Sequence, residues 1–145
     1  MNQAKTVLII DDDPDFVRAV GHLLRSAGYA VASASNGRDG LAHAKTARPD
    51  LILLDVMMQD RTEGFFTLEQ IRDVPALRTT PVIVISSIYS DHPVFRVSPE
   101  SGWLPADLFL PKPIEPARLL AESARLTAPG YVAGEATTGK GSELR

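Results

Sequence analysis

Short apolar runs alternate with amphipathic stretches along the chain, and this alternation predicts its strands and helices. The run from Leu51 to Leu54 contains four large apolar residues in a row, follows Pro49-Asp50 and ends at Asp55. A run of this length is typical of a strand that is buried on both faces of a parallel sheet. The same reasoning predicts strands over residues 6–10, 29–34, 50–55, 82–86 and 106–110.

Between the strands, apolar residues recur at the spacing of a helix with one buried face. The first helix is expected to begin at Asp13-Pro14, a favoured capping residue and a favoured first helical residue, and to end at Gly28. A second helix is expected over residues 38–47. A third follows Gly64 and is expected to bury Phe66, Leu68, Ile71 and Val74. A last helix covers residues 116–126 and is expected to bury Leu119, Leu120 and Ala124.

The order of these elements predicts an α/β fold, in which a doubly wound parallel sheet carries helices on both faces. The segment 87–105 is rich in proline and shows no long helical periodicity, so a fourth helix there is expected to be short or irregular. Beyond residue 126 the composition shifts to small and charged residues. We therefore expect one folded domain over residues 1–126 and a disordered tail over residues 127–145.

Composition narrows the classes of function. The 145 residues are 44% apolar, carry a net charge of -3 and include no cysteine. These values argue against a polyanion partner, a disulfide framework and a cysteine-based metal site. No apolar run approaches the roughly 20 residues of a membrane span, and the N-terminus lacks a signal-peptide core. We expect a cytoplasmic domain that binds neither membrane nor nucleic acid and has no DNA-binding segment after residue 126.

Polar side chains follow four of the predicted strands. Asp11 and Asp12 follow the first, Asp55 ends the third, Ser86 ends the fourth and Lys112 follows the fifth. The carboxyl ends of parallel strands meet at one edge of the sheet, where open α/β folds bind their ligands. Taken singly, these residues could be a helix cap, a turn residue, a strand terminator and a surface lysine. Their arrangement in order predicts a shared site.

This constellation, with Pro113 after Lys112, resembles the receiver domain of two-component response regulators over about residues 5–126. The resemblance implies a flavodoxin-like (βα)5 fold with five strands in the order 2-1-3-4-5. It implies that Asp55 accepts a phosphoryl group, which Ser86 and Lys112 contact. It also implies a switch aromatic at Phe109, a cis Lys112–Pro113 peptide, and Mg²⁺ held by Asp11, Asp12, Asp55 and the backbone carbonyl of Met57.

Elementary chemistry supports these roles independently. Mg²⁺ prefers oxygen ligands and keeps several waters, so a few carboxylates and one carbonyl suffice. Phosphoryl transfer needs an in-line nucleophile and positive charge around the phosphoryl oxygens, which Asp55, the cation and Lys112 would provide. An X-Pro bond adopts the cis form at far lower cost than other peptide bonds.

The sequence departs from the family pattern in three places. Gln59 stands where the family usually has proline, and the loop from Asp55 to Gly64 is about one residue longer than usual. The segment 87–105 is also longer than usual and contains the apolar cluster Trp103-Leu104-Pro105. These differences put the usual dimer and output geometry in question.

Residues beside the predicted site bear on how long a phosphoryl group would survive. Ser87 is small, which leaves access open to a phosphodonor, whereas Met57 and Ile88 are bulky where bulk limits attack by water. The hypothesis is a long-lived phosphoryl aspartate. Loss of the label from the isolated protein within minutes would contradict it.

The favoured function is a module, not an enzyme, that receives a phosphoryl group from a histidine kinase or phosphotransfer protein. It would signal through contacts with a downstream protein, and a homodimer is compatible with this reading. The alternative is a phosphorylation-independent adaptor that docks through 87–105. A flavodoxin-like enzyme or cofactor carrier is disfavoured because Asp11-Asp12-Asp13 stands where a phosphate loop would be.

Other motifs carry less weight. Gly134 to Lys140 has the spacing of a phosphate-binding loop, but Gly141 stands where serine or threonine is required. The scattered histidines, His22, His43 and His92, do not form a recognisable metal motif.

Overall fold

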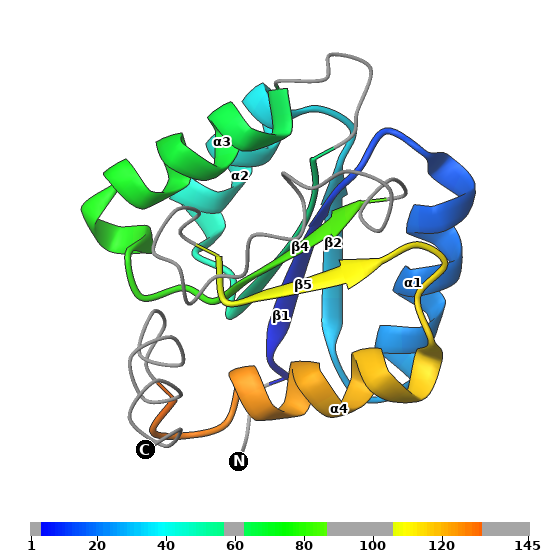
Figure 1. Ribbon diagram of the computed structural model, residues 1–145. Helices are drawn as coiled ribbons and strands as arrows, with labels where there is room; N and C mark the ends of the chain where they lie inside the picture. Colours follow the sequence, from blue (N-terminus) through cyan, green and yellow to red (C-terminus); the bar gives the residue numbers. More distant parts are fainter. Residues whose placement is uncertain (1–3, 57–62, 87–105, 132–145) are drawn as a thin grey trace, which may run out of the picture.

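The computed structural model describes residues 4–56, 63–86 and 106–131, which form a parallel sheet with helices on both faces (Figure 1). The strands are β1 (Thr6–Ile10), β2 (Ala30–Ala34), β3 (Leu51–Asp55), β4 (Val82–Ser86) and β5 (Leu108–Pro111). The helices are α1 (Pro14–Ser26), α2 (Gly37–Ala47), α3 (Glu63–Asp73) and α4 (Pro116–Leu126), with a short 3-10 helix, η1 (Pro75–Leu77). The strands lie in the order β2-β1-β3-β4-β5 and all pairs are parallel. The predicted doubly wound, flavodoxin-like sheet is confirmed.

Alternating side chains of the central strands divide the core into two halves. In β1, Leu8 and Ile10 pack on the side of α2 and α3, whereas Val7 and Ile9 pack on the side of α1 and α4. Because both faces are covered, every residue of β3 and β4 is buried. Each large aliphatic side chain buried in this way stabilises the fold by roughly 1.5–3 kcal/mol. This burial fixes the strand register and therefore the places where the strands end.

The helix starts that the sequence predicts for α1 and α2 are present. The side chain of Asp13 accepts hydrogen bonds from the backbone N–H groups of Asp15 and Phe16 at 3.0 and 3.3 Å. Asn36 caps α2 in the same way by accepting from the N–H of Asp39 at 2.8 Å. These caps satisfy N–H groups that have no partner within the helix.

The buried face of α3 differs from the expectation. Phe66 is 60% exposed, so the prediction that it is buried is wrong. Leu68 and Ile71 are buried, and a residue two positions before Leu68 lies about 200° around the helix from it, on the solvent side. Phe65 packs against the core in place of Phe66.

The buried face of α4 is also shifted. The prediction that Ala124 faces inward is wrong, because Leu119, Ser123 and Leu126 are the buried residues of this helix. Their spacing of four and then three positions places them on one stripe. Leu120 lies beside this stripe and is half-buried.

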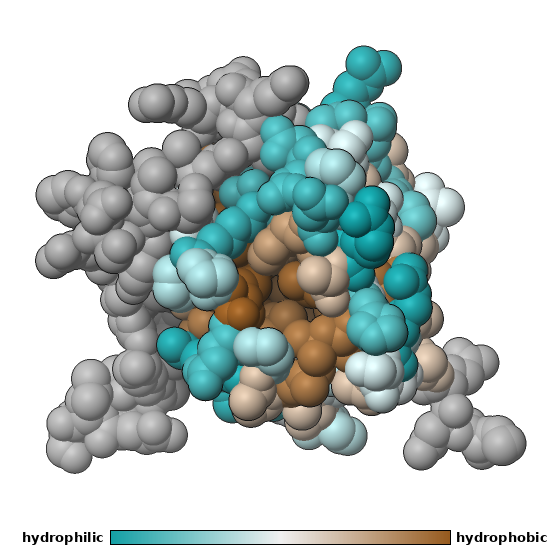
Figure 2. Space-filling view, turned by 90° about the vertical axis from the view of Figure 1, so that its right-hand side faces the viewer, coloured by the Kyte–Doolittle hydropathy of each residue, from teal (hydrophilic) through white to brown (hydrophobic). Residues whose placement is uncertain are grey.

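On the side of α1 and α4, the surface has an apolar hollow ringed by hydrophilic side chains (Figure 2). Several apolar residues on this side are only partly buried against the core, among them Phe16, Val17, Leu23, Ile114 and Leu120. Apolar side chains of α1 and of the loop between β5 and α4 therefore pack on the same side of the sheet.

Beyond residue 126, the predicted domain boundary, the described chain still contacts the core. Residues 127–131 follow α4, and Tyr131 packs partly buried against the core. The segment 87–105, where a short helix is expected, lies outside the described residues, as do residues 132–145 of the tail that is expected to be disordered over 127–145. Among the helices that the structure describes, we find none with the length and apolar character of a membrane span.

Candidate functional site

Four of the predicted site residues lie at the carboxyl edge of the sheet. Asp11 directly follows β1, Asp55 is the last residue of β3, Ser86 is the last of β4 and Lys112 directly follows β5. The backbone N–H of Lys112 donates to the carbonyl of Ser86 at 3.1 Å, so β5 extends along β4 up to the site. The structure thus brings these residues together as the sequence predicted.

The carboxylates of Asp11, Asp12 and Asp55 form an acidic cluster, in which one oxygen from each lies within 4.8 Å of the others. Asp11 and Asp55 are only 2% and 3% exposed. Asp11 Oδ1 accepts a hydrogen bond from the N–H of Asp13 at 2.9 Å. Its other oxygen, Oδ2, is buried and forms no hydrogen bond among the described residues, although it is ion-paired with Lys112.

Lys112 supplies positive charge to this cluster. Its Nζ lies 3.0 Å from Asp11 Oδ2 and 3.4 Å from Asp55 Oδ2, and its side chain is 17% exposed. Burial alone would lower the pKa of the ammonium group, but the two carboxylates outweigh burial and raise it above its ordinary value. Lys112 is therefore charged at neutral pH.

The Asp11 carboxyl group has a strongly perturbed pKa. Burial is the main cause, and together with the negative charge of Asp55 it raises the pKa of Asp11 to about 6. The Asp13 N–H and Lys112 oppose this rise. Any further positive charge placed beside this buried group would stabilise its ionised form.

The acidic cluster fits a hard divalent cation. Three carboxylates supply oxygen ligands, and among the described residues the buried Asp11 Oδ2 has the ion pair with Lys112 but no hydrogen bond. A small, oxygen-seeking ion such as Mg²⁺ needs few protein ligands because it retains water. The fourth predicted ligand, the carbonyl of Met57, lies outside the described residues.

The backbone behind Asp55 is held by a close contact from α3. A side chain on Gly64 would overlap the Cα atom of Val56, and its Cβ would lie only 2.7 Å from the carbonyl oxygen of Asp55. A residue without Cβ is therefore required where α3 begins against the end of β3. This contact fixes the strand end that carries Asp55.

Other predicted residues are placed but their roles stay predictions. Phe109 is 8% exposed and packs in the core on the side of α2 and α3. The Lys112–Pro113 peptide bond is cis. Several residues singled out in the sequence lie outside the described part of the chain, namely Met57, Gln59, Ser87, Ile88, His92, Trp103 and Gly134 to Lys140.

One contact at the site was not foreseen. The ring of Phe16, in the first turn of α1, lies beneath the ammonium group of Lys112, with Nζ 4.3 Å from the ring centroid. The sequence places Phe16 on the apolar face of α1 but gives no signal that this face reaches the loop after β5.

A second polar assembly, also missed from the sequence, lies at the opposite edge of the sheet. Arg72 of α3 donates to Asp107 Oδ2 at 3.1 Å and to the carbonyl of Thr80 at 2.7 Å. Asp107 also accepts from the backbone N–H of Val82 at 2.9 Å and from the hydroxyl of Tyr131. Burial lowers the pKa of Arg72, and the negative charge of Asp107 partly offsets this effect. A strand-leading aspartate such as Asp107 has no sequence signature of this role.

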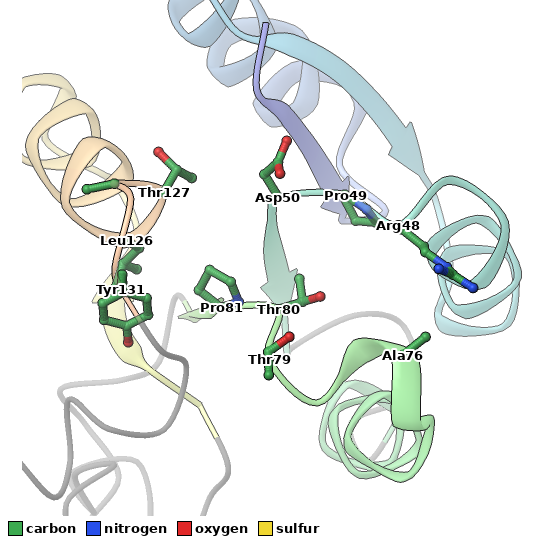
Figure 3. A pocket seen from close by; sticks show the side chains of 11 residues that line it. Arg48, Pro49, Asp50, Ala76, Thr79, Thr80, Pro81, Leu126, Thr127 and Tyr131 are labelled. Carbon is green, nitrogen blue, oxygen red and sulfur yellow. The ribbon is translucent and has the colours of Figure 1, made fainter. Parts of the chain in front are cut away.

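Beside this assembly is a cavity of about 300 Å³ (Figure 3). Asp50 and Thr80, which precede β3 and β4, line it together with Tyr131. Asp50 accepts hydrogen bonds from the backbone and hydroxyl of Thr6 at 2.8 and 3.2 Å. None of the predicted site residues contributes to this cavity.

Comparison with known proteins supports the architecture. The family model for the response regulator receiver domain matches residues 7–124. Response regulator PleD of Caulobacter vibrioides is 37% identical over 122 residues, which cover 83% of this chain and 26% of PleD. The chain therefore spans about a quarter of that relative.

Solved structures show the same fold. The chemotaxis response regulator CheY4 of Vibrio cholerae is 32% identical, with a TM-score of 0.71 over 86% of this chain and 99% of CheY4. The receiver domain of the sensor histidine kinase PA1611 of Pseudomonas aeruginosa has a TM-score of 0.75 at 22% identity over 86% of this chain and 98% of that domain. That structure has a magnesium ion coordinated in its active site cleft.

Proposed function

Because the chain belongs to the response regulator receiver domain family of two-component signalling, we propose that it accepts a phosphoryl group on Asp55. The observation that carries this proposal is the geometry around Asp55. This buried carboxylate ends the central strand, shares a cluster with Asp11 and Asp12, and has the Lys112 ammonium 3.4 Å away. Receiver domains exchange signals with histidine kinases or phosphotransfer proteins, so the donor is a phosphohistidine on such a partner.

In the proposed transfer, an oxygen of Asp55 attacks the phosphorus while the bond from phosphorus to the donor imidazole breaks. The product is an acyl phosphate on Asp55, and the departing imidazole takes up a proton. Lys112 lies where it can offset the negative charge of the phosphoryl oxygens. Ser86, buried at the end of the neighbouring strand, supplies a hydroxyl at the same edge that can donate to a phosphoryl oxygen.

Mg²⁺ is the proposed cofactor, held by Asp11, Asp12, Asp55 and the backbone carbonyl of Met57. When bound, it would neutralise charge on the transferring phosphoryl group. The acidic cluster and the buried Asp11 Oδ2 support this assignment, as does the magnesium site of the PA1611 receiver domain.

The signal is proposed to leave through protein contacts. The new charge and the bonds to Ser86 and Lys112 would shift the conformation of the loops around the site, with Phe109 as the proposed switch aromatic. We expect a cytoplasmic location, as is typical of the family, and no turnover of a separate substrate.

The deciding experiment is intact-mass analysis after incubation with acetyl phosphate and Mg²⁺. We expect the wild type to gain one phosphoryl group and Asp55→Ala to gain none. Asp73→Ala, which removes an exposed carboxylate at the end of α3, is the matched control and should be labelled like the wild type. If Asp55→Ala still gains a phosphoryl group, the acceptor is a residue other than Asp55. No labelling of any variant would favour the phosphorylation-independent adaptor.

A further inference from the structure

The aromatic ring of Phe16 is built into the carboxyl-edge site. Phe16 is the third residue of α1, and its backbone N–H is fixed by the Asp13 cap at 3.3 Å. Its side chain is partly buried against the core on the α1 side. Its ring faces the ammonium group of Lys112, with Nζ 4.3 Å from the centroid. This distance is within the range of a cation–π interaction.

Among the described residues, the Lys112 ammonium group thus has three attractive neighbours of two kinds. Asp11 Oδ2 and Asp55 Oδ2 lie 3.0 and 3.4 Å away, and both carboxylates have another proposed role, in binding Mg²⁺ or accepting the phosphoryl group. A divalent cation competes for both, and a phosphoryl group on Asp55 removes the charge of the oxygen that it esterifies. The Phe16 ring has neither role, so neither a bound cation nor a phosphoryl group on Asp55 would compete with the ammonium group for the ring face.

We propose that Phe16 is a positioning residue for Lys112, whose ammonium group its ring holds at the site when the two carboxylates are engaged elsewhere. This inference rests on the proposed phosphorylation of Asp55 for its functional meaning. The contact itself is a separate physical claim. Leucine at this position would keep the packing against the core but would lack the negatively polarised ring face that attracts a cation.

The contact is tested first without phosphorylation, by NMR of the Lys112 side chain. Protons above an aromatic ring resonate upfield, so the Lys112 Hε signals should be shifted upfield in the wild type. They should remain so after addition of Mg²⁺. The shift should disappear in Phe16→Leu and be retained in Phe16→Tyr. Hε signals at ordinary positions in the wild type, or a shift that Mg²⁺ abolishes, would overturn the proposal.

The consequence is tested by the rate of phosphorylation with acetyl phosphate, a donor too small to report on protein docking. We expect Phe16→Leu to be three- to tenfold slower than the wild type, within the range of cation–π energies. Phe16→Tyr should restore the rate. Phe66→Leu, which changes the exposed phenylalanine of α3, is the matched control and should leave the rate unchanged.

A double-mutant cycle separates positioning from a general effect on the fold. If Phe16 acts through Lys112, Phe16→Leu should have no further effect in a Lys112→Gln background. An equal loss in both backgrounds would contradict the proposal. Phe16→Met replaces Phe16→Leu if the latter does not fold. If the wild type takes no phosphoryl group, the proposed function fails, and the NMR result still decides whether Phe16 holds Lys112.

Discussion

The carboxyl group of Asp11 sits where a negative charge is costly. It is 2% exposed, Asp55 lies in the same cluster, and these surroundings raise its pKa to about 6 from an ordinary value of 3.8. Lys112 offsets only part of this cost. A carboxylate whose charge costs stability in this way is expected at a functional site, where that charge is needed to bind a cation.

This perturbation predicts a pH dependence of stability in metal-free protein. The folded state holds a proton on Asp11 up to about pH 6, whereas the unfolded chain releases it near pH 3.8. The contribution of Asp11 to stability is therefore greatest below pH 3.8 and is lost as the pH rises through 6. Relative to Asp11→Asn, the wild type should lose about 2 kcal/mol of unfolding free energy between pH 4 and pH 7.

Urea unfolding in the presence of a chelator, at several pH values, measures this difference. Asp73→Asn is the control, because its carboxylate is exposed, and it should follow the wild type throughout. A constant gap between wild type and Asp11→Asn across this pH range would contradict the assignment.

Ser123 gives a second prediction at the scale of one residue. It is fully buried in α4, and its Oγ has no hydrogen-bond partner among the described residues. Burying an unpaired hydroxyl costs roughly 1–3 kcal/mol, so Ser123→Ala should raise the unfolding free energy by about 1 kcal/mol. Thermal and urea unfolding check this. Ala124→Ser, on the exposed neighbour, should change stability by less than about 0.5 kcal/mol. A destabilised Ser123→Ala would show that the hydroxyl is satisfied.

At the scale of elements, the site depends on where α3 begins. Gly64 lets the first turn of α3 lie directly against the backbone of Asp55 and Val56. The strand end and the helix start are thus one packed unit. The position of Asp55 is therefore set by the helix that follows it as well as by its strand.

Gly64→Ala should push α3 away from the end of β3. Overpacking of this kind costs about 1–3 kcal/mol, and we also expect weaker Mg²⁺ binding because Asp55 moves. Gly21→Ala in α1 is the matched control. There the added Cβ meets Arg25 Nη1 at 3.3 Å, the movable end of a long side chain, so stability should be unchanged or about 0.5–1 kcal/mol higher. Unfolding curves and Mg²⁺ titration measure both effects. Wild-type stability and wild-type Mg²⁺ affinity in Gly64→Ala would contradict this close contact.

On the scale of the whole molecule, the two edges of the sheet carry different polar assemblies. The carboxyl edge gathers the acidic cluster and Lys112. The opposite edge is tied together by Arg72, Asp107 and Tyr131, which come from α3, from the residue before β5 and from the chain after α4. Figure 3 shows Tyr131 beside the residues that lead into β3 and β4. The second assembly thus joins the C-terminal end of the described chain to the sheet.

Tyr131→Phe should reveal this attachment. Asp107 Oδ1 would lose its hydroxyl donor while remaining buried, so the unfolding free energy should fall by about 1–3 kcal/mol. Tyr29→Phe is the control, because the half-buried Tyr29 hydroxyl donates no hydrogen bond to a described residue, and its stability should match the wild type. Equal stability of the two variants would mean that the residues after α4 do not contribute to the fold.

The sequence alone determined the strands, their order along the chain and the chemistry at their ends. Apolar runs such as Leu51 to Leu54 specify strands because only burial on two faces accounts for them. The ends of these runs then place Asp55 and the other site residues at one edge of the sheet, because parallel strands end on the same side.

Only the tertiary structure decided which helix residues face inward and which polar groups meet across the sheet. The helices containing Phe66 and Ser123 have several apolar or small residues around their circumference, so periodicity alone did not fix their rotation. Phe16 and Lys112 lie far apart in the sequence, as do Arg72 and Tyr131. Such contacts follow from how elements pack in three dimensions, and local pattern contains no information about distances of that kind.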